Sequence, residues 1–306
     1  MKKKMIGMMM AAVMAVGMFA GCGGSSSSPT TPAGGSESTA ASGTEDSGEQ
    51  KVLRVGMECA YAPFNWTQET EEVSNGDKAV PIYGANNQYA YGYDVMMAKK
   101  IADELGWGLE IHKVEWDSIG MAMDSGEYDC IIAGMGKTAE REASYSFTEP
   151  YYFRDNCITV KKGSDLENIK GLSELAGKNV TVTTQLGTGW VPLLDQIPDA
   201  KLGSNYETTA ECFMAISNGV ADVAVIDVPT AESAAMTNPD LKVIQLDSND
   251  TFQNDQEMTN VCIATRKDDT ELRDKIQGVM DKIGWNDKAK MDEMMDEAIK
   301  VQPAAN

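Results

Sequence analysis

The chain has 306 residues, of which 42% are apolar, enough for one large domain or two of ordinary size. It carries 47 acidic and 26 basic residues, a formal charge of -21 and an isoelectric point near 4.4. A surface this acidic repels phosphate backbones, which excludes nucleic acid as an expected partner. The single histidine, His112, lies in a strand-like segment where we expect it to be exposed, which argues against multi-histidine zinc sites and Ser-His-Asp triads. We expect no metal and no cofactor.

The first 21 residues have the pattern of a lipoprotein signal peptide. Three lysines precede an apolar run over residues 5–20, and a membrane span needs about 20 apolar residues. Small residues before Cys22 resemble a lipobox, in which the cysteine is acylated and becomes the new N-terminus. Phe19 stands where leucine is commonest. A plain secretory signal or a short anchor is the alternative.

A polar segment rich in serine, glycine and threonine follows the predicted acylated cysteine. Residues 22–50 offer almost nothing apolar to bury, and we expect a disordered tether that spans roughly 30 Å. Cleavage after residue 21 removes three lysines and no acid, which changes the formal charge from -21 to -24. The sequence therefore predicts an extracytoplasmic protein, tethered to the cell membrane by acylated Cys22.

Five cysteines follow Cys22, and none forms a CxxC pair. Cys130 and Cys212 lie in apolar stretches, and we expect most of the five to be buried free thiols. Cys157 and Cys262 are expected on strands that run side by side. A disulfide between them stays open, because sequence spacing does not show Cβ geometry.

From residue 51 onward, strand and helix patterns alternate, which favours an α/β fold with much parallel pairing. The segments MAMDSGEYDCIIAG (121–134) and MAISNGVADVAVID (214–227) align 93 residues apart. Each predicts a helix, a glycine stop, a turn aspartate and a buried strand, and the copies end at Gly134 and Asp227. Two lobes of one plan would bring their strand ends to a common cleft, where open α/β sheets bind ligands.

The predicted lobes are joined by two crossings. We expect residues 155–163 to carry the chain out of the first lobe and residues 257–269 to carry it back, forming a hinge. Lobe 1 would then comprise residues 51–157 and 258–306, and lobe 2 residues 158–257.

Two charged residues are candidates for holding a zwitterion. Arg141 follows the glycine-rich AGMGKT and a helix N-cap at Thr138, so a guanidinium and backbone NH groups would surround an anion. Its alternative is an exposed arginine paired with Glu140 or with a neighbouring turn. Asp227 ends a buried strand and could receive an ammonium group, or it could cap the helix that starts near Pro229.

Three further candidates come from glycine-rich or aromatic strand ends. Thr188, in QLGTG, could bind a carboxylate from the second lobe, or simply belong to a strand-to-helix turn. MECAYAPFNW places Glu58 and Tyr61 after the first strand, where an acid could meet a polar side chain and an aromatic ring could wall a slot. Core packing is the default for Phe64 and Trp66.

In combination these stretches resemble the family 3 extracytoplasmic solute-binding proteins, which bind amino acids for ABC importers. The similarity runs from about residue 51 to the end, through LRVGMECAYAPF, GYDVMMAKKIADELG, MDSGEYDCIIAGMGKTAER, FTEPYY, QLGTG and GVADVAVIDVPTA. It implies a two-lobed periplasmic-binding-protein fold of type II, with the ligand cleft between lobes joined by two hinge strands.

The resemblance also implies roles for the candidate residues. Arg141 would clamp the α-carboxylate of the ligand with help from Thr188. Asp227 would take the α-ammonium, which the backbone at Gly134 would also accept, and Tyr61 would lie against the ligand.

The sequence departs from the family in three places. Gly136 stands where serine or threonine is frequent, and Glu58 where aspartate is common. Residues 65–91 are longer than usual, and their Asn-Gly pair predicts an added hairpin on the cleft rim. These differences concern the side-chain pocket and leave the clamp for the α groups intact.

The expected function is capture of a polar or charged amino acid by a lipid-anchored, monomeric protein that delivers it to an ABC permease, without catalysis. Glu58 and Tyr61 favour arginine, lysine or another polar amino acid. The alternatives are a dehydratase-like or peptidoglycan-cleaving enzyme on the same fold, with Glu58 as its acid, and a ligand sensor for a membrane receptor.

Overall fold

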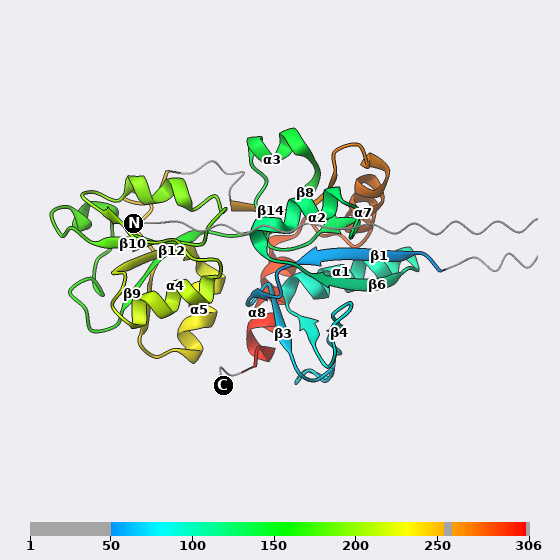
Figure 1. The fold of residues 1–306 in the computed structure, drawn as a ribbon, viewed down its shortest axis with the longest axis horizontal. Coiled ribbons are helices and arrows are strands. Elements are labelled where there is room, and N and C mark those ends of the chain that lie inside the picture. The colour runs from blue at the N-terminus through cyan, green and yellow to red at the C-terminus, as the bar shows by residue number, and fades with distance from the viewer. Residues whose placement is uncertain (1–49, 254–258, 304–306) are drawn as a thin grey trace, which may run out of the picture. The chain divides into compact units, whose positions relative to one another are not determined.

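The computed structural model describes residues 50–253 and 259–303, all of which belong to one compact unit. The predicted signal peptide, Cys22 and nearly all of the predicted tether lie outside these residues. Within them the strands form three sheets (Figure 1).

The first sheet has the strand order β6-β1-β7-β14-β8. The pairs β1–β6 and β1–β7 are parallel, whereas β14 runs antiparallel to both β7 and β8. Its strands are β1 (Val52–Met57), β6 (Gly108–Lys113), β7 (Cys130–Ile131), β8 (Tyr145–Phe153) and β14 (Asn260–Arg266).

The second sheet has the order β11-β10-β12-β9-β13. The pairs β10–β11 and β10–β12 are parallel, and β9 runs antiparallel to both β12 and β13. Its strands are β9 (Asn156–Lys161), β10 (Thr181–Thr183), β11 (Lys201–Leu202), β12 (Val223–Asp227) and β13 (Leu241–Ile244).

The two sheets share one plan, as the repeat in the sequence predicts. Val55 of β1 pairs with Cys130, and Val182 of β10 pairs with Val223, which are the repeat-related positions. The turn aspartates are equivalent down to single atoms, because each accepts a hydrogen bond from a backbone N–H of the first strand. Asp129 Oδ2 accepts from Arg54 N at 3.2 Å, and Asp222 Oδ2 accepts from Thr181 N at 2.7 Å. The two-lobed α/β prediction is confirmed.

The glycine stops of the repeat also behave alike. Gly126 and Gly219 adopt φ values of 85° and 70°, in the left-handed region that glycine tolerates. In both copies the next residue bonds back to an alanine carbonyl, as Glu127 N does to Ala122 O at 3.1 Å. This hydrogen-bond pattern ends the preceding helix. It favours glycine at the helix end, so the two helix ends could be predicted from the sequence.

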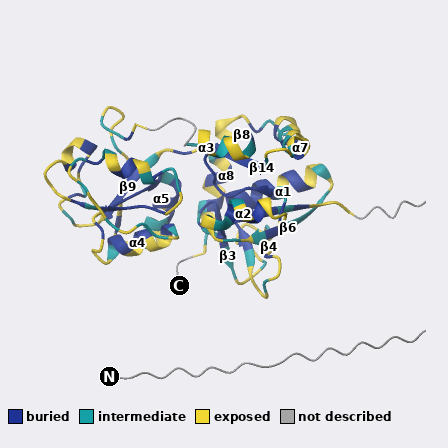
Figure 2. Cartoon of the chain, turned by 45° about the horizontal axis from the view of Figure 1, so that its top comes forward, coloured by how far each residue is buried: buried dark blue, intermediate teal, exposed yellow. Residues whose placement is uncertain are grey.

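Helices cover the sheets with their apolar faces. Helix α1, for example, packs on β1 and β6, while α4 and α5 pack on β9 and β12. The inner strands are buried and the outer faces of the helices are exposed (Figure 2). The helices are α1 (Tyr93–Leu105), α2 (Ile119–Asp124), α3 (Ala139–Ser144), α4 (Thr209–Ser217), α5 (Val228–Thr237), α7 (Thr270–Lys282), α8 (Lys288–Val301) and the 3-10 helices η1 (Trp116–Ser118), η2 (Leu172–Leu175) and η3 (Val191–Gln196).

Residues 60–91 fold into a small antiparallel sheet with the order β2-β3-β5-β4. Its strands are β2 (Ala60–Tyr61), β3 (Asn65–Gln68), β4 (Val80–Pro81) and β5 (Tyr89–Tyr91). The Asn75-Gly76 pair lies in a turn that Glu72 and Lys78 bridge, and Asn75 Nδ2 donates to Glu297 Oε1 of α8 at 2.7 Å.

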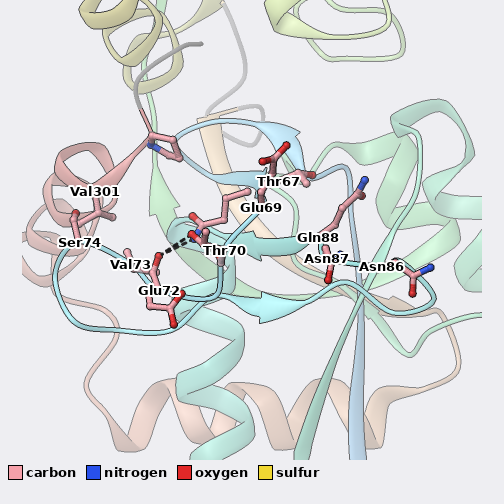
Figure 3. Close-up of a pocket in the computed structure, with 12 residues that line it drawn as sticks. Thr67, Glu69, Thr70, Glu72, Val73, Ser74, Asn86, Asn87, Gln88 and Val301 are labelled. Carbon is pink, nitrogen blue, oxygen red and sulfur yellow. Dashed lines mark hydrogen bonds between the residues drawn. The ribbon is translucent and has the colours of Figure 1, made fainter.

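A surface hollow lies beside this small sheet. Its volume is about 910 Å³, and its lining is polar, with Thr67, Glu72 and Asn87 among the residues drawn (Figure 3). None of the predicted site residues lines this hollow.

The two crossings lie side by side, but not along the strands that the sequence suggested. Phe153 pairs with Asn260, and Arg154 N donates to Thr259 O at 3.1 Å. Beyond this point β9 belongs to the second sheet and β14 to the first, and each is the fourth strand in the order of its own sheet, antiparallel to both neighbours. The expectation that Cys157 and Cys262 lie on neighbouring strands is therefore wrong. We propose that lobe 1 ends before β9, about two residues earlier than predicted.

All five cysteines within the described residues are buried free thiols, and no disulfide joins Cys157 to Cys262. His112 lies on strand β6 as predicted, but it is not exposed: its ring stacks on Tyr83 with the ring centroids 4.5 Å apart. Phe64 and Trp66 belong to the core, as expected. Among the described helices, none combines the length and the apolar character that crossing a bilayer demands.

Candidate functional site

A cavity lies where strand ends of the first and second sheets meet. Glu58 follows β1, Gly134 follows β7, and Gln185 follows β10, so the cavity is at the carboxyl ends of parallel strands, where α/β sheets bind ligands. Its volume of about 20 Å³ holds about one water molecule. This cavity alone is too small for an amino acid. The lining residues are Glu58, Tyr61, Trp116, Ala133, Gly134, Arg141, Arg154, Gln185, Thr188, Gly189 and Trp190.

Arg141 reaches this cavity from the short helix α3. Thr138 caps the helix, as predicted, by accepting a hydrogen bond from Arg141 N at 3.2 Å. The guanidinium donates to Gly136 O at 2.8 Å and, across to the second lobe, to Gly187 O at 3.2 Å. Within the described residues it forms no ion pair with Glu140, but its bond to Gly136 O is a contact with the preceding turn, which the alternative interpretation also allowed.

The electrostatic setting of Arg141 is unusual for an arginine. Burial lowers its pKa to about 10, and the positive charge of Arg154 adds to the lowering. Its guanidinium carbon also lies 5.3 Å from the centre of the Trp116 ring. A desolvated guanidinium whose two hydrogen bonds are to neutral carbonyls gains strongly from a carboxylate partner.

Asp227 is fully buried at the end of β12, where it caps α5. Its Oδ1 accepts from Thr230 N at 3.0 Å, so the capping role that the sequence allowed is confirmed. Its Oδ2 accepts a short hydrogen bond from the hydroxyl of Tyr61. Asp227 therefore reaches the cavity through Tyr61, which is itself one of the lining residues.

Tyr61 links the two lobes. Its ring stacks on Phe64 with centroids 4.9 Å apart, and burial raises the pKa of its hydroxyl. That hydroxyl accepts a hydrogen bond from Arg154 Nη1 at 2.7 Å while it donates to Asp227. The resulting chain, Arg154 to Tyr61 to Asp227, was not predicted.

Glu58 also contacts the second lobe. Gln185 Nε2 lies 3.1 Å from its Oε1 and 3.2 Å from its Oε2. Burial raises the pKa of Glu58 to about 7, against the lowering effect of this hydrogen bond. The carboxyl group is thus close to half protonated at neutral pH, and Gln185 is a site residue that the sequence did not indicate.

The remaining predicted residues are Thr188, Gly134 and Gly136, which lie in loops at or near the cavity. Thr188 lines the cavity, and its hydroxyl donates to Gln185 O at 2.7 Å. Gly134 has a φ of 61°, and a Cβ placed there would come within 2.5 Å of the Tyr61 ring. Gly136 does not line the cavity, but its carbonyl holds Arg141.

Arg154 is the most informative residue that the sequence analysis missed. It follows the FTEPYY segment, lies between β8 and β9, and is buried although its neighbours Phe153 and Asp155 are exposed. A lone arginine between apolar strand segments was the available signal, but nothing local indicated which cavity it enters. Among the described residues, no cluster of histidine, cysteine or acidic side chains is arranged to hold a metal ion.

Comparisons with known proteins agree with this architecture. The arginine-binding extracellular protein ArtP of Bacillus subtilis (strain 168) is 28% identical over 249 residues, which are 76% of this chain and 86% of that protein. The amino acid ABC transporter substrate-binding protein AbpA of Streptococcus pneumoniae Canada MDR_19A, solved with L-arginine bound, is 25% identical with a TM-score of 0.66, over 82% of this chain and 97% of that one.

A third similar protein is described as the precursor of an enzyme. The ancestral amino acid-binding protein AncCDT-1, a precursor of cyclohexadienyl dehydratase, is 27% identical with a TM-score of 0.63, over 81% of this chain and 95% of that one. The model of the bacterial extracellular solute-binding proteins, family 3, matches residues 73–296, which is well over half of the chain. The chain belongs to this family.

Proposed function

We propose that the protein is the lipid-anchored substrate-binding component of an ABC importer and that it captures a polar or charged amino acid between its two lobes. The observation that carries the proposal is the meeting of Arg141, which lacks an ion pair among the described residues, with the Tyr61–Asp227 contact at one cavity. Named relatives that bind arginine, histidine and cystine support an amino acid as the ligand.

Binding follows from the charges of the site. Arg141 takes the α-carboxylate, with Thr188 beside it, and Asp227 and Gly134 O take the α-ammonium. Charged hydrogen bonds of about 1.5–3 kcal/mol each are sufficient for micromolar affinity, near -8.2 kcal/mol. Lobe separation admits the ligand and closure buries it, after which the closed form is recognised by the permease.

Replacing Arg141 with lysine tests this role. Lysine keeps the charge but loses the planar fork, so we expect the affinity for the bound amino acid to fall by roughly 30-fold to 100-fold, as about 2–3 kcal/mol of paired hydrogen bonding is lost. Isothermal titration of the purified protein against the common amino acids measures the effect. The matched control is Arg273→Lys, on the surface of α7, which should leave affinity unchanged; unaltered binding by Arg141→Lys would refute the clamp.

The anchor and the location are supported by the signal pattern and by a family of extracellular proteins. We infer that acylated Cys22 holds the folded unit at the outer face of the cell membrane through residues 23–50. Metabolic labelling with a radioactive fatty acid tests the anchor, and a protein that takes up no label would exclude it.

One observation favours a catalytic alternative. Glu58 is buried with a pKa of about 7, which suits a general acid near neutral pH, and a relative is described as the precursor of a dehydratase. Both Glu58 oxygens, however, accept from Gln185, so neither points freely at a scissile bond. Recovery of a chemically altered amino acid after incubation would decide for the enzyme, and recovery of the intact ligand for the binding protein.

A further inference from the structure

Arg154 brings a second guanidinium to the cavity, and it is buried, with only 9% of the residue exposed, whereas Arg141 is partly exposed. Both of its hydrogen bonds within the described residues come from Nη1, to Gly134 O at 2.8 Å and to the Tyr61 hydroxyl at 2.7 Å. Its Nε is buried and has no hydrogen-bond partner. A buried donor without a partner is costly to the folded protein, and a ligand group that accepted from it would remove this cost.

Two aromatic rings hold the guanidinium in place. Its central carbon lies 5.2 Å from the centre of the Trp190 ring and 5.9 Å from that of Phe64. Trp190 is anchored by its Nε1–H, which donates to Asn156 Oδ1 at 2.9 Å. Arg154 is therefore a fixed part of the cavity wall, since rings from both lobes contact it.

Neither guanidinium in the cavity is neutralised by a direct ion pair within the described residues. Arg154 reaches Asp227 only through the Tyr61 hydroxyl, and Arg141 bonds to two carbonyls. The two like charges repel each other, as the lowered pKa of Arg141 reflects. An anionic group placed beside them relieves this repulsion.

The charges left after the α groups are assigned indicate the chemistry of the ligand side chain. With Arg141 on the α-carboxylate and Asp227 on the α-ammonium, Arg154 and Glu58 remain. Glu58 already accepts two contacts from Gln185 and is partly protonated near neutral pH, whereas Arg154 is fully charged and has a free donor. The residual charge is thus positive, contrary to the preference for a cationic side chain that Glu58 suggested in the sequence.

We propose that Arg154 is a specificity-determining residue that receives a carboxylate at the end of the ligand side chain, so that the ligand class is the acidic amino acids. The inference rests on the proposed function, because it assumes that Arg141 and Asp227 hold the α groups.

The ammonium subsite remains usable with Arg154 in place. A carbonyl oxygen has two lone pairs, so Gly134 O can accept from the ligand ammonium in addition to Arg154. The Asp227 carboxylate has about four acceptor positions, of which Tyr61 and Thr230 use two. Arg154 therefore adds an anion subsite without removing the ammonium subsite.

The test compares L-glutamate with L-glutamine, which differ in charge but hardly in shape. Isothermal titration of the wild-type protein should show binding of L-glutamate at least about tenfold tighter than that of L-glutamine or L-arginine. In Arg154→Gln the affinity for L-glutamate should fall by about tenfold or more, while that for L-glutamine changes by less than about threefold. A merely structural arginine would lower both affinities together.

Further variants keep the result interpretable. Arg273→Gln, on the surface, should leave both affinities unchanged. If Arg154→Gln does not fold, Arg154→Lys keeps the charge and should bind L-glutamate more weakly while still preferring it to L-glutamine.

Several outcomes would overturn the inference. A wild-type protein that binds L-glutamine or L-arginine as tightly as L-glutamate would remove the assignment to Arg154, as would a variant with an unchanged preference. The proposed function would then stand on the Arg141→Lys result alone. Failure to bind any amino acid would overturn both.

Discussion

The first and second sheets meet the candidate site at equivalent strand ends. Counted from the paired residues of β1 and β10, Glu58 of the first lobe corresponds to Gln185 of the second, and these two side chains bond to each other. In the same way Tyr61 corresponds to Thr188, and both line the cavity. The repeated arrangement of strands thus places equivalent residues of the two lobes opposite each other. The chemistry of the site comes from the different residue types at these equivalent positions.

The third equivalent pair shows the largest divergence. Gly134 and Asp227 both follow the third strand of their sheet, but Gly134 turns left-handed and presents its carbonyl, whereas Asp227 is extended and caps a helix. The first lobe therefore brings two guanidinium groups, a carbonyl and the Glu58 carboxyl group to the site, and the second lobe brings the Asp227 carboxylate. Such asymmetry on a symmetric frame suits a ligand whose two ends carry opposite charges.

We expect the largest loss of stability when the first lobe receives a side chain at its divergent position, Gly134. Gly134→Ala places a Cβ in the left-handed region and 2.5 Å from the Tyr61 ring, so we expect the free energy of unfolding to fall by about 2–5 kcal/mol. Gly126→Ala is the matched control, because Gly126 has a φ of 85° but no neighbour within 4 Å of its Cβ. Urea unfolding of both variants separates the clash from the backbone cost. Equal losses would show that Tyr61 is not packed against Gly134.

The Glu58–Gln185 pair predicts that the stability of the protein depends on pH. Only Glu58 can cause this dependence, because glutamine does not titrate. The pKa of Glu58 in the folded protein, about 7, exceeds its value of 4.5 when unfolded. Between these values the folded state binds the proton more tightly, so stability is lost as the pH rises. From pH 5 to pH 7.5 the wild-type protein should lose about 2–3 kcal/mol relative to Glu58→Gln.

Urea unfolding at several pH values measures this difference. Asp94, buried with a pKa of about 6, titrates in both proteins and cancels in the comparison. Gln185→Met removes the hydrogen bond that lowers the pKa of Glu58, and should extend the loss to higher pH. Parallel pH profiles for wild type and Glu58→Gln would contradict the assignment.

The sequence predicted the parts of this frame that depend on local chemistry. A glycine with a left-handed conformation and a turn aspartate can be recognised within a few residues of sequence. For that reason the repeat could be predicted at Gly126 and Gly219. Arg141 was predicted as a candidate because a glycine-rich bend and a helix cap precede it. In each instance the turn or helix end and the residue that stabilises it lie within a few residues of each other in the sequence.

The parts that were missed depend on contacts between distant segments. Arg154 lies far along the chain from Tyr61, and its importance follows from rings contributed by both lobes. Gln185 matters because it faces Glu58, 127 residues away. The pairing of Cys157 and Cys262 was misjudged because two adjacent crossings were taken as one pair of strands, although β9 and β14 belong to different sheets. Such facts follow from sheet topology, which a strand pattern alone does not determine.

The smallest expected effect concerns the turn aspartates, which repeat most faithfully. Asp222 accepts from Thr181 N alone within the described residues, but Asp129 also pairs with the Arg54 guanidinium, at 3.1 Å from Nε and 2.5 Å from Nη2. We expect Asp222→Ala to cost about 1 kcal/mol and Asp129→Ala about 2 kcal/mol, because the extra ion pair is partly exposed and screened. Arg266 Nη2 also lies 3.6 Å from Asp129 Oδ1. In an Arg54→Met, Arg266→Met background the two losses should therefore become equal, since only the shared backbone contact then remains. Urea unfolding of these variants measures this, and a difference that persists without both arginines would mean that the two turns are not equivalent.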